Sequence, residues 1–133
     1  MKRVIFIDDD FSGIEMYKNA CETEFADVKS EYYEQPEIAF DAIKNDTSNI
    51  SLIILDIMFA GDGEFEGGFD RGRTYYYKIK EILPKAKIII FTNRIKGNMY
   101  DFFEEIQRDK NLFIEKPEKL VSDFITLITR YLS

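Results

Sequence analysis

The sequence predicts an α/β protein, a (βα)5 sandwich of helix, sheet and helix layers. Short runs of branched and aromatic apolar residues recur five times along the chain. Longer segments with apolar residues at helical spacing lie between and after them. Such a repeated alternation is typical of parallel strands joined by right-handed helical crossovers.

The predicted strands differ in how apolar they are. Four are short apolar runs, at residues 4–7, 50–55, 87–91 and 112–114. Segment 28–33 is a weaker fifth strand because polar residues interleave with its apolar ones. Since helices cover both faces of a parallel sheet, we expect three of these strands to be buried on both sides.

Each strand is followed by a predicted helix. The first spans 11–25 with Ser12 as its N-cap, and the second carries Pro36 in its first turn. The expected core stripes of the later helices are Ile38, Ala39, Ala42 and Ile43; then Tyr75, Ile79, Ile82 and Leu83, stopped by Pro84; then Met99, Phe102, Phe103 and Ile106; and last Leu120, Phe124, Leu127, Ile128 and Tyr131.

Two helices are richer in apolar residues than one stripe requires. Of the three tyrosines at 75–77, we expect one ring to be buried and two to lie on the surface. The last helix adds Val121, Ile125 and Leu132 beside its stripe, which indicates either a partner surface or deeper burial.

Composition limits the class of protein. With 133 residues, the chain is expected to be a single domain over 1–133 without an attached output domain. Its net charge of -7 argues against direct contact with nucleic acid. A lone cysteine, Cys21, cannot form an internal disulfide, and we find no signal-like or membrane-length apolar run. We therefore expect a cytoplasmic protein with no membrane contact.

The complete absence of histidine excludes His-based triads and His-ligated metals, so a metal here must be held by oxygen. The stretch 60–74, rich in glycine and acids, is longer than an ordinary connection between strand and helix. We therefore expect it to be a functional or mobile loop.

Polar residues follow the strands at the edge where ligands bind in open parallel sheets. In chain order they are Asp8, Asp9 and Asp10; Asp56; Thr92 and Asn93; and Lys116 and Pro117. A divalent cation with oxygen ligands, Mg²⁺ or Mn²⁺, would balance the charges of Asp8, Asp9, Asp56 and Lys116. A carboxylate in such a site is a plausible nucleophile toward phosphorus.

Four motifs at these strand ends, VIFIDDD, LDIM, IIIFTN and LFIEKP, resemble those of the receiver domains of bacterial two-component response regulators, in particular chemotaxis-regulator-like ones. The resemblance covers essentially the whole chain. It implies a flavodoxin-like sheet with strand order 2-1-3-4-5. It also implies phosphorelay signal transduction rather than enzymatic turnover, with only Mg-dependent self-phosphorylation and self-dephosphorylation at one aspartate.

The resemblance also implies the role of each site residue. Asp56 is the phosphoacceptor. Asp9, Asp56 and the Met58 carbonyl bind the metal, with Asp8 as their neighbour. Lys116 contacts the phosphate, and its bond to Pro117 is expected to be cis. Thr92 and Phe113 form the switch.

The same resemblance implies the partners. A sensor histidine kinase or phosphotransfer protein supplies the phosphoryl group. A downstream protein binds the face formed by the fourth helix, fifth strand and fifth helix, and homodimerisation stays open. The chain departs from the family in having Phe59 and Ala60 where Met-Pro is usual, and in Asn93 where a small residue is commoner.

Two alternatives remain at this point. Residues 8–12 also fit the opening motif of haloacid-dehalogenase-like phosphatases, but that leaves Asp56 unexplained and only Glu118 and Asp123 as a later acidic pair. The second alternative is a receiver-like binding module that is never phosphorylated.

Overall fold

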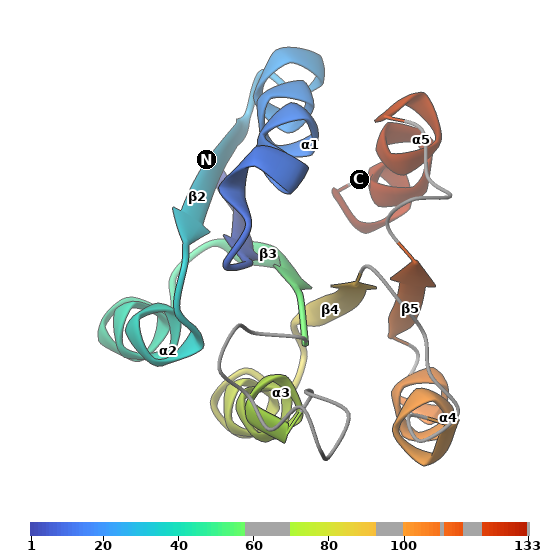
Figure 1. The fold of residues 1–133 in the computed structure, drawn as a ribbon. Coiled ribbons are helices and arrows are strands. Elements are labelled where there is room, and N and C mark those ends of the chain that lie inside the picture. The colour runs from blue at the N-terminus through green and yellow to red at the C-terminus, as the bar shows by residue number, and fades with distance from the viewer. Residues whose placement is uncertain (58–69, 93–99, 110, 116–120, 133) are drawn as a thin grey trace.

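The computed structural model describes residues 1–57, 70–92, 100–109, 111–115 and 121–132, in which strands and helices alternate (Figure 1). The strands are β1 (Lys2–Ile7), β2 (Val28–Tyr33), β3 (Ile50–Leu55), β4 (Lys87–Thr92) and β5 (Leu112–Glu115). The helices are α1 (Phe11–Glu24), α2 (Pro36–Asn45), α3 (Asp70–Ile82), α4 (Tyr100–Arg108) and α5 (Val121–Leu132).

The strands form one parallel sheet in the order β2-β1-β3-β4-β5. The predicted α/β class, the five helices and the strand order β2-β1-β3-β4 are confirmed. At the far edge, β5 pairs with β4 from Leu112 opposite Ile89 to Glu115 opposite Thr92.

Helices cover both faces of this sheet, with α1 and α5 on one side and α2, α3 and α4 on the other (Figure 1). Successive strand residues alternate between the two cores, so that Val4 and Phe6 face α1 and α5 while Ile5 and Ile7 face α2 and α3. Burial on both faces is thereby confirmed for β1, β3 and β4.

The start of α1 corrects the predicted cap. Asp10, not Ser12, is the N-cap residue, and its Oδ1 accepts from the Gly13 N–H at 3.2 Å. The Ser12 hydroxyl donates to the same oxygen at 2.7 Å. The preceding acid takes the cap because its carboxylate can accept both hydrogen bonds at once. The proline prediction for α2 is confirmed, since Pro36 opens that helix.

α3 begins at Asp70, inside the stretch 60–74 that was predicted to be a loop. Arg71 pairs with Glu37 on α2 through Nε to Oε1 at 2.6 Å and Nη2 to Oε2 at 2.7 Å. Gly72 lies against the backbone of Ile57. These tertiary contacts offset the low helix propensity of glycine, which is why local composition was misleading there. Residues 60–69 of the predicted loop lie outside the described ranges.

The predicted stripe of α3 is confirmed at Ile79, which is fully buried, and at Ile82 and Leu83, which pack against the core, but not at Tyr75. Tyr76 is fully buried, Tyr77 is 41% exposed, and Tyr75 is half-buried against Phe40 of α2. One buried ring among the three is therefore confirmed, although the stripe runs through Tyr76 rather than Tyr75. The Tyr76 hydroxyl donates to Asp109 and accepts from the Asn111 amide, each at 3.0 Å, which satisfies it in the core.

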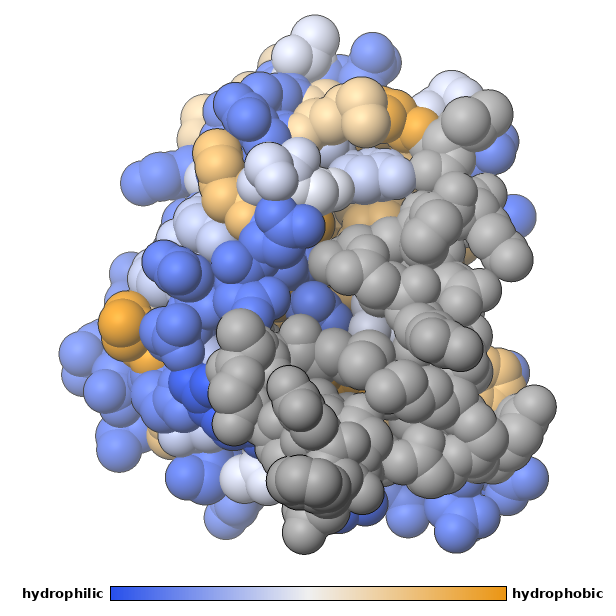
Figure 2. Space-filling model, in the orientation of Figure 1, coloured by the Kyte–Doolittle hydropathy of each residue, from blue (hydrophilic) through white to orange (hydrophobic). Residues whose placement is uncertain are grey.

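The last two helices follow their predicted stripes where they are described. Phe102 and Ile106 of α4 are buried, and Phe124 and Ile128 of α5 are buried. Val121 and Ile125 are half-buried against the α1 side of the core and Leu132 is buried, which favours the deeper-burial alternative for α5. Ile38 of α2, which was predicted to lie in a core stripe, is instead 59% exposed. Apolar side chains also gather on the surface between α1 and α5 (Figure 2).

Met99 and Leu120 of the predicted stripes lie outside the described residues. Within the described ranges, each helix is too short or too polar to cross a lipid bilayer.

Arg3 joins β1 to β2 through a two-pronged ion pair with Glu31, Nε to Oε2 at 2.5 Å and Nη2 to Oε1 at 3.0 Å. This hydrogen-bonded guanidinium lowers the pKa of the Glu31 carboxyl below its usual value of 4.5. Because the folded pKa is the lower one, the pair stabilises the fold fully above pH 4.5 and loses its contribution as the pH falls through the folded pKa.

We therefore expect Glu31→Gln to cost about 1 kcal/mol of unfolding free energy at neutral pH, and almost nothing at a pH below the folded pKa of Glu31. Urea unfolding of both proteins, from neutral pH down to that acidic pH, measures the difference. Glu15→Gln, at an exposed position of α1, is the matched control. A difference that is independent of pH would contradict the assignment.

Candidate functional site

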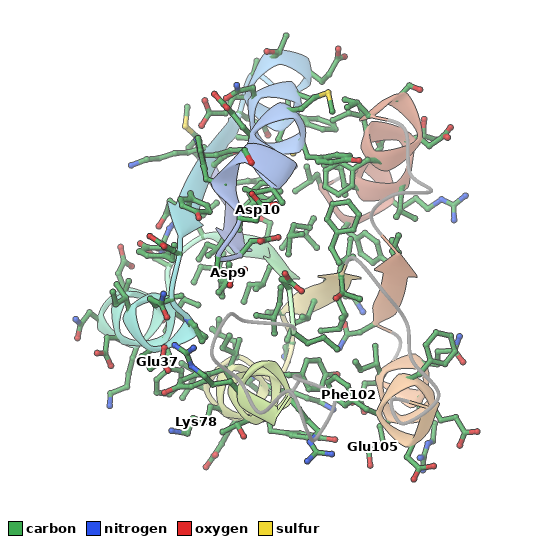
Figure 3. All side chains as sticks on the ribbon, in the orientation of Figure 1. Asp9, Asp10, Glu37, Lys78, Phe102 and Glu105 are labelled. Carbon is green, nitrogen blue, oxygen red and sulfur yellow. The ribbon has the colours of Figure 1, made fainter. Side chains whose placement is uncertain are left out.

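Three predicted site carboxylates meet at the carboxyl edge of the sheet. Asp8, Asp9 and Asp56 each place a carboxylate oxygen within 4.8 Å of the other two. Asp8 and Asp56 are only 2% exposed, while Asp9 is half-buried. Figure 3 shows Asp9 just beyond the end of β1 and Asp10 at the first turn of α1. The spatial convergence predicted from the sequence is thus confirmed for these three acids.

Strand register brings Asp8 and Asp56 together. β1 and β3 pair with Ile7 opposite Leu55, and the Asp56 N–H continues the ladder by donating to the Ile7 carbonyl at 2.9 Å. The Asp8 N–H continues the other ladder by donating to the Tyr33 carbonyl at 3.1 Å. Each acid therefore lies one residue beyond the end of its strand, and its backbone N–H is still hydrogen-bonded to the adjacent strand.

Asp10, the third acid after β1, has a structural role. Asp10 caps α1, and its own N–H donates to Asp8 Oδ1 at 2.8 Å. This turn orients the Asp8 carboxylate and keeps Asp10 outside the cluster. The DDD run thus divides into two cluster acids and one structural cap.

Thr92 ends β4, and its side chain is fully buried. Within the described part of the chain, its hydroxyl has no hydrogen-bond partner. A buried hydroxyl without a partner costs free energy, so such groups are rare unless a ligand or a water satisfies them. The pairing of Thr92 with Glu115 also sets the residue just before Lys116 beside this strand end.

Several predicted site residues lie outside the described part of the chain. These are Met58, Asn93, Lys116 and Pro117, together with the Lys116–Pro117 bond that was expected to be cis. Phe113 lies in β5 by its backbone, opposite Ile90.

Two residues near the acids were missed by the sequence reasoning. The Tyr32 hydroxyl donates to the Asp8 carbonyl oxygen at 2.6 Å, and Gly72 of α3 lies against Ile57, the residue after Asp56. Burial, together with the nearby carboxylates of Asp8, Glu34, Asp9 and Asp10, raises the pKa of Tyr32 to about 12. Tyr32 therefore stays protonated at neutral pH and remains a hydrogen-bond donor. Its place at the end of the strand paired with β1 is the only signal that could have suggested it.

The cluster fits a hard divalent cation. Its donors are all carboxylate oxygens, the ligand type that Mg²⁺, Mn²⁺ and Ca²⁺ prefer. Buried carboxylates this close repel one another strongly in a medium of low dielectric constant, and a doubly charged cation would relieve that repulsion. The arrangement is thus suited to bind a cation and to direct a carboxylate oxygen at an electrophile.

Neither a sequence-family model nor a curated protein sequence matches the chain. Among solved structures, a CheY-like response regulator receiver domain protein from Methanospirillum hungatei JF-1 is 20% identical, with a TM-score of 0.78 over 99% of this chain and 94% of that one. A receiver domain protein from Clostridium thermocellum is 16% identical, with a TM-score of 0.76 over 99% and 94%.

CheY of Borrelia burgdorferi, solved in a complex with CheX, BeF3 and Mg²⁺, is 18% identical, with a TM-score of 0.73 over 99% of this chain and 90% of that one. At these identities the comparisons establish the fold. The chain has the fold of response regulator receiver domains along its whole length.

Proposed function

We propose that this chain works as a receiver domain in a two-component phosphorelay, accepting a phosphoryl group on Asp56 and switching a partner-binding face. The observation that carries the proposal is the meeting of Asp8, Asp9 and Asp56 within 4.8 Å at the carboxyl edge of a receiver-type sheet. Motif resemblance and whole-chain structural likeness independently point to the same family.

The carboxylates of Asp9 and Asp56, with the Met58 carbonyl, would hold Mg²⁺ or Mn²⁺, and Asp8 would stand beside them. When bound, the cation supplies positive charge next to the acceptor and the transferring phosphoryl oxygens. CheY of Borrelia burgdorferi was solved with BeF3 and Mg²⁺, and this supports the same pairing of metal and phosphoryl mimic here.

By the same resemblance, the donor is a phosphohistidine of a sensor histidine kinase or phosphotransfer protein. It must lie on another protein, because this chain contains no histidine. An Asp56 oxygen forms a bond to phosphorus in line with the P–N bond, which breaks and leaves its electron pair on the imidazole. Lys116 contacts one phosphoryl oxygen. Later attack by water on the same phosphorus restores the Asp56 carboxylate and releases phosphate.

Phosphorylation changes the charge of the Asp56 side chain from -1 to about -2 near neutral pH. The Thr92 hydroxyl, which is buried without a partner in the described part of the chain, gains an acceptor in the phosphoryl group. Phe113 then repacks, and the face of α4, β5 and α5 changes its affinity for a downstream protein. The switch is a population shift driven by the different affinity of two packings for the phosphoryl group.

Beryllofluoride binding and labelling by acetyl phosphate test the proposal. We expect stoichiometric binding of beryllofluoride in MgCl₂ and none when the metal is chelated, and stoichiometric labelling by acetyl phosphate. A protein that does neither would support the unphosphorylated binding module. Repeated turnover of a small phosphate ester would support the phosphatase alternative, which gives Asp56 no role although it lies in the acid cluster.

We also expect Mg²⁺ to raise the melting temperature. Binding to the folded state at tenfold excess over the dissociation constant adds about 1.4 kcal/mol of stability, equivalent to about 5 °C for a domain of this size. Scanning calorimetry with and without MgCl₂ measures the rise. NaCl of equal ionic strength is the control, because salt screening also weakens carboxylate repulsion. Equal melting temperatures in the two salts would argue against the metal site.

A further inference from the structure

We propose that Tyr32 of β2 is a positioning residue, whose hydroxyl sets the orientation of the peptide that joins Asp8 to Asp9 and thereby aims the Asp9 carboxylate at the metal. This role rests on the proposed metal site. Tyr32 reaches the site through the backbone of the first-strand acids rather than through a carboxylate.

The neighbouring strand holds both backbone polar groups of Asp8. The Asp8 N–H donates to the Tyr33 carbonyl at 3.1 Å, as an ordinary continuation of the ladder between β1 and β2. Past this point the chain turns toward α1. The Tyr32 hydroxyl donates to the Asp8 carbonyl oxygen at 2.6 Å, so a side chain of β2 holds this carbonyl beyond the end of the ladder.

The orientation of the Asp8 carbonyl determines the direction in which Asp9 leaves the end of β1. The peptide group is planar, so the direction of the Asp8 carbonyl oxygen also sets the direction of the Asp9 N–H and the line along which the Asp9 Cα leaves the corner. Asp9 is only half-buried, whereas Asp8 and Asp56 are 2% exposed. It is therefore the member of the cluster that depends most on its backbone for alignment.

The Tyr32 ring is itself held in place. It packs edge-on against Phe11 of α1, with ring centroids 4.7 Å apart and an interplanar angle of 62°. It also lies against the core between α1 and the sheet. Because the ring is already packed on two sides, its hydroxyl loses little further conformational entropy on bonding the carbonyl. The hydrogen bond can therefore hold the carbonyl in one orientation.

The adjacent tyrosine offers a matched control. Tyr33 is also half-buried in β2, but strand alternation turns it toward the opposite core, and its hydroxyl donates to Glu31 Oε1 at 3.2 Å. Tyr32→Phe and Tyr33→Phe each delete one hydroxyl and keep the ring. Only the first of these changes removes a hydrogen bond to the corner that carries the acids.

Isothermal titration with MgCl₂ on the intact protein tests the proposal. We expect Tyr32→Phe to raise the dissociation constant for Mg²⁺ about five- to tenfold, and Tyr33→Phe to leave it within about twofold of the unmodified protein. Urea unfolding in parallel reports stability. A merely structural hydroxyl would lower stability without moving the dissociation constant measured on fully folded protein.

An unchanged dissociation constant in Tyr32→Phe, with clear Mg²⁺ binding by the unmodified protein, would overturn the positioning role and leave the metal site intact. Absence of Mg²⁺ binding by the unmodified protein would instead remove the metal site, and this role with it. Phe11→Leu is a second variant at a 41% exposed position, which keeps the hydroxyl but removes the ring behind it. It should raise the constant about two- to threefold, and no change there would also contradict the proposal.

Discussion

Replacing Asp56 by asparagine or alanine is expected to abolish phosphoryl labelling completely. The carboxylate oxygen is the proposed nucleophile, and neither an amide nor a methyl group can form the same acyl phosphate. Asparagine nearly preserves the shape of a side chain that is 2% exposed, so loss of labelling in that variant reports chemistry rather than packing. Incubation with acetyl phosphate and MgCl₂, followed by intact-mass measurement, gives the labelled fraction directly.

Asp41→Asn, at an exposed position of α2, is the control for this experiment and should label like the unmodified protein. The Asp56→Asn protein should also show a smaller rise of melting temperature with Mg²⁺, because one of the three clustered carboxylates is gone. Labelling that persists in Asp56→Asn, or that moves to Asp9, would show that the nucleophile has been assigned to the wrong acid.

Gly72→Ala is expected to lower the stability of the protein strongly, more than Gly13→Ala does. A Cβ at this position of α3 would lie 2.2 Å from the Ile57 Cα and 2.6 Å from the Ile57 carbonyl oxygen. Backbone atoms cannot rotate away as a side chain can, so either the helix or the segment after β3 must move. Overpacking of this kind costs about 3 kcal/mol, against about 1 kcal/mol gained from the better helix propensity of alanine.

The net loss of about 2 kcal/mol or more should appear in urea unfolding as a lower midpoint. Because Ile57 directly follows Asp56, the displaced backbone should also slow labelling by acetyl phosphate. Gly13→Ala in α1 is the matched control. The nearest atom to its added Cβ is Asp10 Oδ2 at 2.8 Å, which belongs to the capping side chain and not to the backbone. That side chain can shift slightly, so the expected change is within about 1 kcal/mol. Equal stabilities for the two variants would contradict the close approach of α3 to Ile57.

These contacts also explain where the sequence-based prediction of α3 was wrong. Gly72, and the glycine-rich acidic stretch before it, indicate a loop by every local rule. A glycine is required there because the helix backbone passes against Ile57, and Arg71 anchors the same turn to Glu37 of α2. Both partners are distant in sequence, so no window around residue 72 contains them. The burial of Tyr76 in place of Tyr75 has the same origin, since Asp109 accepts a hydrogen bond from the buried hydroxyl and the Asn111 amide donates one to it.

The sequence by itself determined the strand and helix alternation, the central strands that are buried on both faces, and the acids that end β1 and β3. These features follow from local patterns, because burial on two faces requires a continuous apolar run and a strand end is marked where that run stops. Only the tertiary structure decided that Asp10 caps α1 while Asp8 and Asp9 lie beside Asp56. It also decided that the Tyr32 hydroxyl donates a hydrogen bond to the Asp8 carbonyl. Those choices depend on distances of a few ångströms between neighbouring strands and helices, which strand register and helix packing set and no local pattern encodes.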